Sequence, residues 1–300
     1  MRWRIAVSAA IGLLSGAFCW FLMMHFHQDA ADFRWAILLA QHVVNGQNPY
    51  DTPHQLYPLT AAFFALPLLR LTPEVAAGIF WGISSFLLAF GLTRHGYGKL
   101  LIFLAYPYWA GILTVQWPPI ICAAAFFPLL LPATMAKPQI GLPVFLTRLS
   151  LRGVAACAAL GVLSLAVMPN WPRLWLRQIG SYDHFYPLLI LPGQLLLLAL
   201  LRYRDRDARL LMLAALMPER WFYDSFILWL IPQSRREIIW TVFFSWGAGI
   251  WRWYHIPHTF TEVGRWTVIF LYLPMLAVVL LRKPQRDVST PDSAGSLTPA

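Results

Sequence analysis

Long apolar runs separated by short polar segments make up most of this chain. A helix needs about 20 apolar residues to cross a bilayer. Several of the runs are shorter than that, so they are predicted to form short, broken or re-entrant helices. The pattern therefore predicts an all-α, polytopic transmembrane bundle of about 10 to 12 spans. The runs lie near residues 5–24, 58–70, 74–93, 100–115, 119–133, 138–147, 151–168, 187–201, 209–218, 221–232, 237–251 and 266–281.

The first long polar interruption lies between about residues 25 and 57. Arg2 and Arg4 precede the first apolar run, and positive charge favours the cytoplasmic side of a membrane helix. The interruption is therefore predicted to lie outside. By the same rule, the loops at residues 202–209 and 235–236 are predicted to lie inside.

Within this outer loop, residues 32–45 are predicted to form a short amphipathic helix lying along the membrane interface. Its polar face carries Arg34, Gln41, His42 and Asn45. The Asn45-Gly46 pair is a typical helix stop, and Pro49 and Pro53 prevent an immediate restart. A turn is expected to follow, before the chain re-enters the membrane at Tyr57-Pro58.

The composition supports a membrane protein, because 59% of the residues are hydrophobic and only 12% are charged. The net charge of +10 comes from basic clusters between apolar runs, which indicate membrane topology and not a nucleic-acid partner. If all twelve runs cross, both termini are cytoplasmic, but this count places Arg94 and Lys99 outside.

The chain is predicted to hold one membrane domain over residues 1–285. No small-residue cleavage site follows the first apolar run, so that run is interpreted as a retained helix. Residues 286–300 are rich in Ser, Thr, Pro and Asp and are expected to be a disordered cytoplasmic tail. The three cysteines lie inside apolar runs, which favours neither a disulfide framework nor a zinc site.

Several motifs of the first outer loop resemble a known family. Asp32-Phe33 is followed by Gly46-Gln47-Asn48-Pro49-Tyr50-Asp51, by Tyr57-Pro58 and by an apolar run ending at Pro67-Leu68. This order is similar to the start of the GT-C glycosyltransferases. It most resembles glycosyltransferase family 87, the polyprenol-phosphate-mannose-dependent mannosyltransferases. Further matches, in the order of the family, are Gln116, Lys137-Pro138-Gln139, Pro218 and Tyr223-Asp224.

The resemblance implies an integral membrane hexosyltransferase of the bacterial plasma membrane. Such an enzyme moves a sugar, here mannose, from a polyprenyl-phosphate donor to a hydroxyl of a lipid or glycan acceptor on the outer face, with inversion. The expected partners are therefore this donor, the acceptor and membrane lipids, without nucleic acid. No cofactor is expected, and the absence of a phosphate-binding glycine loop argues against a nucleotide-sugar donor.

Asp32 matches the position of the catalytic carboxylate in the family, so it is the candidate base for the acceptor hydroxyl. Asp is also a favoured N-cap residue, and Asp32 stands where a cap of the interfacial helix is expected. Asp29 is the nearby competitor and is interpreted as a solvated loop charge.

A departing lipid phosphate needs cationic partners. Lys137 is predicted to bind the donor phosphate, with membrane anchoring by its long side chain as the alternative. Arg173 and Arg177 follow in a Trp-containing outer segment and are further phosphate candidates, although Arg and Trp at a membrane boundary also serve as anchors.

Polar and aromatic side chains are predicted to hold the sugar and the acceptor. They are Asn48, Tyr50, Tyr57, Gln116, Gln139, Tyr223 and Asp224. Asn48-Pro49 and Tyr57-Pro58 are also good turn formers. Glu219 and Arg220 interrupt an apolar stretch, which is compatible either with a structural ion pair or with a cluster facing acceptor or phosphate.

Two other classes of membrane protein also fit the sequence. A transporter or flippase of lipid-linked sugars would use a similar basic and aromatic cavity. The family usually has Gly before the Gln at the position of Gln116 and an Asn shortly after it, whereas this chain has Val115 and Trp117-Pro118, which keeps open a catalytically silent assembly subunit. His25, His27, His255 and His258 lack a third ligand at fixed spacing, so no metal is predicted.

Overall fold

The computed structural model describes residues 1–282, so the predicted tail at 286–300 lies outside the described residues. The α-helices are α1 (Arg2–Phe26), α2 (Arg34–Val44), α3 (Ala62–Ala65), α4 (Pro73–Leu92), α5 (Tyr106–Ile112), α6 (Pro118–Ala124), α7 (Pro138–Thr147), α8 (Leu151–Val167), α9 (Trp171–Gln178), α10 (Arg206–Ala215), α11 (Arg235–Tyr254), α12 (Phe260–Thr267) and α13 (Leu273–Leu281). Shorter 3-10 segments are η1 (Ala31–Phe33), η2 (Pro49–Asp51), η3 (Leu59–Ala61), η4 (Leu66–Leu68), η5 (Thr93–His95), η6 (Tyr97–Leu104), η7 (Pro128–Met135), η8 (Ile179–Ser181), η9 (Pro187–Leu189), η10 (Gly193–Arg202) and η11 (Asp224–Leu230), and η12 (Val268–Tyr272) is a π-helix.

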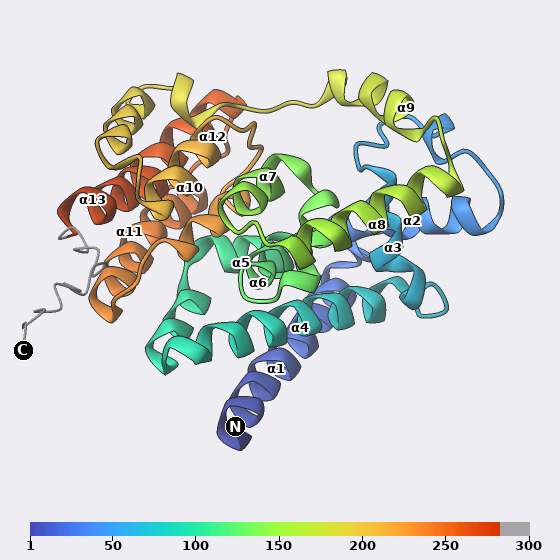
Figure 1. The fold of residues 1–300 in the computed structure, drawn as a ribbon, viewed down its shortest axis with the longest axis horizontal. Helices are drawn as coiled ribbons and strands as arrows, with labels where there is room; N and C mark the ends of the chain where they lie inside the picture. Colours follow the sequence, from blue (N-terminus) through green and yellow to red (C-terminus); the bar gives the residue numbers. More distant parts are fainter. Residues whose placement is uncertain (283–300) are drawn as a thin grey trace, which may run out of the picture.

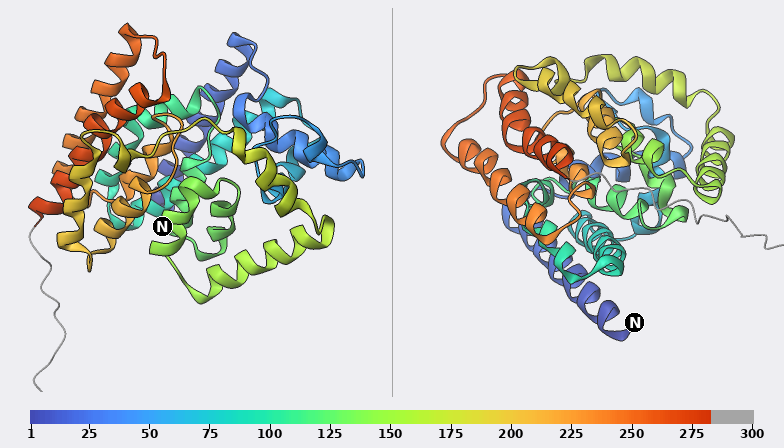
Figure 2. Two further views of the ribbon diagram at one scale, coloured as in Figure 1. Left: turned by 90° about the horizontal axis from the view of Figure 1, so that it is seen from above. Right: turned by 60° about the vertical axis from the view of Figure 1, so that its left-hand side comes forward.

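The all-α prediction is confirmed, since residues 1–282 form helices and no strand beyond an isolated bridge between Phe185 and Glu219. In Figure 1 the helices α10 to α13 gather at one end of the molecule, and α2, α3, α8 and α9 lie at the other. The short helices α5, α6 and α7 lie between these two groups. The views in Figure 2 show the same division.

Within residues 1–282, three helical stretches are long and apolar enough to cross a membrane, namely Arg2–Phe26, Pro73–His95 and Phe260–Leu281. A fourth is obtained if α8 and the α9–η8 segment, which meet at a bend of 93°, count as one broken span. These helices are consistent with an integral membrane protein, and they are fewer than the 10 to 12 spans, some of them short or broken, that the sequence predicts. The reason is that prolines at the first turns of α5, α6, η7 and α7 start new short helices within the apolar runs.

The two long helices α1 and α4 pack antiparallel and in close contact. A Cβ added at Gly16 would lie 2.8 Å from the carbonyl oxygen of Gly78, and one at Gly82 would lie 2.9 Å from that of Gly12. Both helices thus carry a Gly-x-x-x-Gly pair at their crossing, an arrangement that lets membrane helices approach through their backbones.

This packing accounts for the exception in the charge pattern. Arg4 near the start of α1 donates to the carbonyl of Phe90 at 3.0 Å and to the hydroxyl of Thr93 at 3.3 Å, so the N-terminus and the end of α4 lie at the same end of the pair. The apolar run at 58–70 forms only the short η3, α3 and η4 and does not separate α1 from α4 by a further long span. Arg94 therefore lies on the side of Arg4, where the positive-inside rule favours it.

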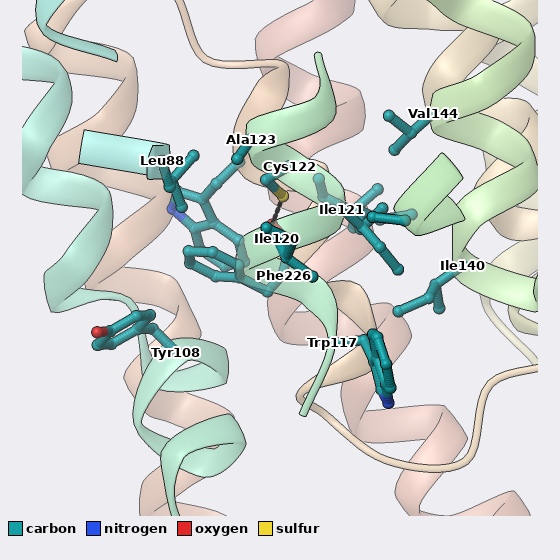
Figure 3. Close-up of a cluster of buried hydrophobic side chains, with 14 of the residues drawn as sticks. Leu88, Tyr108, Trp117, Ile120, Ile121, Cys122, Ala123, Ile140, Val144 and Phe226 are labelled. Carbon is teal, nitrogen blue, oxygen red and sulfur yellow. Dashed lines mark hydrogen bonds between the residues drawn. The ribbon is translucent and has the colours of Figure 1, made fainter. Parts of the chain in front are cut away.

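Helix α6 lies in the core, and all of its residues are buried. Figure 3 shows Ile120, Ile121 and Cys122 of this helix surrounded by side chains of α4, α7 and η11, including Leu88, Ile140, Val144 and Phe226. The thiol of Cys122 points to the carbonyl oxygen of Phe226. This buried helix fixes the segment immediately before it, which carries Gln116.

The predicted helix at residues 32–45 is formed by η1 and α2. It ends at Asn45, and Gly46 adopts a positive φ of 67°, as expected for a glycine at a helix stop. Its position at the membrane interface stays a prediction.

Candidate functional site

Asp32 lies in η1, directly before α2. Its Oδ2 atom accepts a hydrogen bond from the hydroxyl of Tyr57 and a second one, at 2.7 Å, from the Nε2 of Gln116. The Oδ1 atom accepts none from residues 1–282. No side chain caps the N-terminus of α2, so the carboxylate of Asp32 faces these two donors and does not serve as a helix cap.

Aromatic packing brings the three segments of this contact together. Trp117, fully buried beside Gln116, has its ring centroid 5.9 Å from that of Phe33 and 6.0 Å from that of Tyr57. The amide N–H of Asp32 also donates to the carbonyl of Thr114 at 3.1 Å. Asp32 and Gln116 are therefore the sequence neighbours of Phe33 and Trp117, and Tyr57 belongs to the aromatic cluster itself.

Val115 stands where the resembling family has glycine, and its backbone has the conformation that glycine readily adopts. Its φ is 51°, in the left-handed region that β-branched residues rarely enter. The next amide, of Gln116, donates to the carbonyl of Gly111 at 3.0 Å and closes the turn. The departure in sequence thus leaves a strained turn at the site, a feature that is common around functional residues.

A chain of polar contacts continues from Gln116 into the protein. The Nζ of Lys137 donates to the Oε1 of Gln116 at 2.6 Å and lies 2.7 Å from the Oδ1 of Asp224. The other carboxylate oxygen of Asp224 accepts the backbone N–H of Arg220 at 3.1 Å. The chain thus runs from η1 through the start of α7 to η11.

Lys137 and Asp224 form a buried ion pair, with side chains only 6% and 0% exposed. The ammonium also lies 5.0 Å from the ring centroid of Tyr223. Because a buried charge is costly unless it is paired, this mutual neutralisation is what allows both residues to lie inside the protein.

Arg220 differs from Lys137 because it forms no ion pair with a carboxylate of residues 1–282. Its guanidinium carbon lies 5.7 Å from the ring centroids of both Tyr182 and Phe260. Its neighbour Glu219 points elsewhere, since its carboxylate accepts hydrogen bonds from Ser225 and Tyr272. The structural Glu219–Arg220 pair considered from the sequence is therefore not formed.

Asp32 and Arg220 line the same cavity of about 370 Å³. The aromatic side chains around it are Trp35, Tyr57, Tyr182 and Tyr223, and the polar ones include His54, Lys137, Gln139, Ser181 and Asp183. Such a mixture of aromatic surfaces, charges and hydrogen-bonding groups suits a ligand that carries both hydroxyls and charge.

The phenols of Tyr57 and Tyr223 both lie beside a carboxylate and keep their protons. Burial, and after it the neighbouring carboxylate of Asp32, raises the pKa of Tyr57 well above its usual value. Burial likewise raises the pKa of Tyr223, with Asp224 as the next contribution. Both hydroxyls therefore stay protonated at neutral pH, and Tyr57 keeps donating to Asp32.

Helix α9 braces one wall of the cavity. The indole N–H of Trp175 donates to the carbonyl of Leu56 at 2.9 Å, and the Nε2 of Gln178 donates to the carbonyl of Tyr50 at 3.0 Å. These bonds hold the segment that carries Tyr57 and bring residues 181–183 to the cavity wall.

Most of the residues predicted from the sequence come together here. Asp32, Tyr57, Gln116, Lys137, Gln139, Tyr223 and Asp224 line the cavity or join the polar chain beside it. Gln139 donates to the hydroxyl of Tyr182 at 3.4 Å.

The other predicted residues have different surroundings. Asn48 accepts the backbone N–H of Tyr50 and caps η2, and the buried Tyr50 donates to the carbonyl of Tyr57. Arg173 and Arg177 lie exposed on α9 and are not among the residues lining the cavity.

Five polar or aromatic lining residues were not predicted from the sequence, namely Trp35, His54, Ser181, Tyr182 and Asp183. The Tyr182-Asp183-His184 stretch is polar and aromatic, and this composition is a signal that could have identified it. Among residues 1–282, no group of three or more His, Cys, Asp or Glu side chains is placed to hold a metal ion.

Comparisons of the chain with protein-family models, with curated proteins and with solved structures found no match. The function of the chain is therefore inferred from the chemistry of this cavity and from the motif resemblance over residues 32–68.

Proposed function

We propose that this protein is a membrane glycosyltransferase that moves a sugar from a polyprenyl-phosphate donor to an acceptor hydroxyl. The observation that carries the proposal is the carboxylate of Asp32. It lies in a polar and aromatic cavity, and both of its hydrogen bonds go to Oδ2, so Oδ1 is left for a ligand.

In this reaction the Oδ1 of Asp32 takes the proton of the acceptor hydroxyl. The acceptor oxygen then forms a bond to the anomeric carbon, while the bond from that carbon to the phosphate oxygen breaks. The electron pair leaves with the lipid phosphate, and attack from the opposite side inverts the anomeric centre. Tyr57 and Gln116 hold the carboxylate in the orientation that the proton transfer needs.

Arg220 is the side chain best suited to receive the departing phosphate. Lys137 is already neutralised by Asp224, whereas Arg220 lines the cavity without a carboxylate partner among residues 1–282. A guanidinium presents several N–H groups in one plane and stabilises a phosphate by paired hydrogen bonds. Aromatic side chains such as Trp35 and Tyr223 offer apolar surface for the sugar ring.

The location of the reaction and the identity of the sugar belong to the same proposal. A retained first helix with Arg2 and Arg4 at its start favours an outer position for Asp32. This position and the resemblance of the first loop favour mannose on polyprenyl phosphate, used at the outer face of a bacterial plasma membrane, with a lipid or glycan as acceptor.

The test is Asp32→Asn in purified protein supplied with polyprenyl-phosphate mannose and an acceptor mixture. Asparagine keeps the size of the side chain and can still accept the two hydrogen bonds, but it takes up no proton. Transfer is expected to fall by about 10² to 10⁴-fold, the usual contribution of a general base, with unchanged abundance in the membrane.

Asp29→Asn is the matched control. Asp29 lies three positions earlier and pairs at 3.1 Å with Arg34, with both side chains about half exposed. It is expected to retain full transfer. Full activity of the Asp32 variant, or equal loss in both variants, would remove Asp32 as the base.

A further inference from the structure

The amide of Gln116 has one allowed orientation, and its neighbours determine it. Its Nε2 faces a carboxylate oxygen of Asp32 at 2.7 Å, and its Oε1 faces the ammonium of Lys137 at 2.6 Å. A lysine ammonium only donates hydrogen bonds, and a carboxylate only accepts them. Flipping the amide would set donor against donor and acceptor against acceptor.

Lys137 remains a hydrogen-bond donor to Gln116 because the position and charge of its ammonium are fixed. Asp224, which is fully buried, holds the ammonium at 2.7 Å, and the backbone of Arg220 holds Asp224 in turn. Gln116 is itself 1% exposed, so water does not compete effectively for its amide. The order of donors and acceptors is therefore set from the buried ion pair outward to Asp32.

We propose that Gln116, Lys137 and Asp224 form a positioning relay for the base. In this relay the buried pair locks the amide, and the amide holds Oδ2 of Asp32 so that Oδ1 faces the acceptor. This inference rests on the proposed transfer reaction and gives Lys137 a positioning role in place of the phosphate contact predicted from the sequence.

The relay also determines the charge around Asp32. The neutral amide and the phenol of Tyr57 are its direct partners, and the other titratable groups on the cavity wall are His54, Lys137, Tyr182, Asp183, Arg220 and Tyr223. No second carboxylate forms a hydrogen bond with Asp32 among residues 1–282. Placing one at position 116 is therefore a direct perturbation of the base.

Gln116→Glu tests the relay with little change in shape. One oxygen of the new side chain keeps the contact with Lys137, while the other replaces the donated N–H with an acceptor facing Asp32. Two carboxylates in contact share a proton and titrate as a pair. The acidic limb of the pH profile for transfer is expected to move to higher pH by about one unit or more.

A second variant tests the buried end of the relay, which is the pair of Lys137 and Asp224. Lys137→Gln combined with Asp224→Asn removes both charges together, so no unpaired buried charge remains, but position 116 can now flip. The turnover number is expected to fall on the order of 10²-fold, the effect of a small misplacement of a catalytic group, with little change in the Michaelis constant. Lys137→Arg alone, with Asp224 kept, still places a side chain that only donates hydrogen bonds against Gln116. This variant should retain part of the rate that the double variant loses.

A measurement without substrate separates this proposal from the proposed function. Infrared titration of the carboxyl groups isolates the signal that depends on Asp32, with Asp32→Asn as the subtraction reference for the unaltered chain and Asp32→Asn combined with Gln116→Glu as the reference for the variant. A shift to higher pH in Gln116→Glu supports the relay even if no lipid-linked sugar is turned over. An unchanged infrared titration in that variant, or full turnover in the double variant, would overturn the relay while leaving Asp32 as a base.

Discussion

The buried pair of Lys137 and Asp224 gives the sharpest prediction for stability. The Nζ and Oδ1 atoms are 2.7 Å apart, and both side chains are almost inaccessible to solvent. Removing one partner leaves the other charged and unpaired, which costs about 3 to 5 kcal/mol in comparable buried pairs. Lys137→Met and Asp224→Asn are each expected to destabilise the protein by about this amount.

Combining Lys137→Met with Asp224→Asn separates the energy of the ion pair from the loss of packing. With both charges removed, no unpaired charge stays buried, so the double variant is expected to be more stable than either single variant. The asparagine can still accept the backbone N–H of Arg220 through its carbonyl. The coupling in this double-mutant cycle should therefore be large, on the order of 3 kcal/mol.

The assay is equilibrium unfolding in mixed micelles with increasing denaturing detergent, followed by the fluorescence of the tryptophans. The exposed pair of Asp29 and Arg34 is the control, because its side chains are 49% and 58% exposed and such pairs contribute little. Arg34→Met is expected to change the free energy of unfolding by less than about 1 kcal/mol. Additive effects in the Lys137 and Asp224 cycle would refute the argument that the two charges neutralise each other.

Three further predictions concern other parts of the molecule. Cysteines introduced as Gln47→Cys and Arg204→Cys should react with an impermeant reagent in intact cells only at position 47, and the reverse labelling would contradict the topology. Gly16→Ala should lower thermal stability by about 1 to 3 kcal/mol because its Cβ would meet a backbone oxygen of α4 at 2.8 Å, whereas Gly180→Ala, with open space around it, should not. Burial, followed by the nearby Asp224, raises the pKa of Glu219 from 4.5 to about 8, so the folded state holds a proton there that the unfolded chain has lost. Stability is therefore expected to fall as pH rises from about 4.5 to about 8 and to level off above this range, and Glu219→Gln should flatten this part of a melting-temperature profile.

Local patterns predicted the helix and turn over residues 32–51 well. The helix over 32–45, its stop at Gly46 and the turn after it follow from residues that lie close together in sequence, where capping and turn preferences act. The predicted 10 to 12 spans, some short or broken, exceed the three or four long apolar helices of residues 1–282, because apolar composition alone does not show where a proline restarts a helix. The early helices that contain Pro118 and Pro138 illustrate this limit.

Long-range contacts decided which predicted residues meet. Asp32 and Gln116 are 84 residues apart, and Lys137 and Asp224 are 87 apart, so no local periodicity relates them. The role of Asp32 was ambiguous in the sequence because a helix cap and a base need the same residue type at the same place. The direction of its side chain, toward Tyr57 and Gln116, excludes the helix cap, and the role of Asp32 as a base stays a prediction.

The cavity wall carries both acidic and basic side chains. Lys137 and Asp224 neutralise each other, and Glu219 holds its proton inside the protein, so these residues add little net charge at the cavity. Among residues 1–282, the other side chains on the cavity wall that carry charge are the carboxylates of Asp32 and Asp183 and the guanidinium of Arg220. A base and a separate cation are what a neutral hydroxyl and a departing phosphate require, respectively. A donor without phosphate would leave Arg220 without a ligand. Arg220→Gln is therefore expected to lose lipid-phosphate binding, whereas the exposed control Arg173→Gln should keep it. This binding measurement tests the donor class independently of turnover.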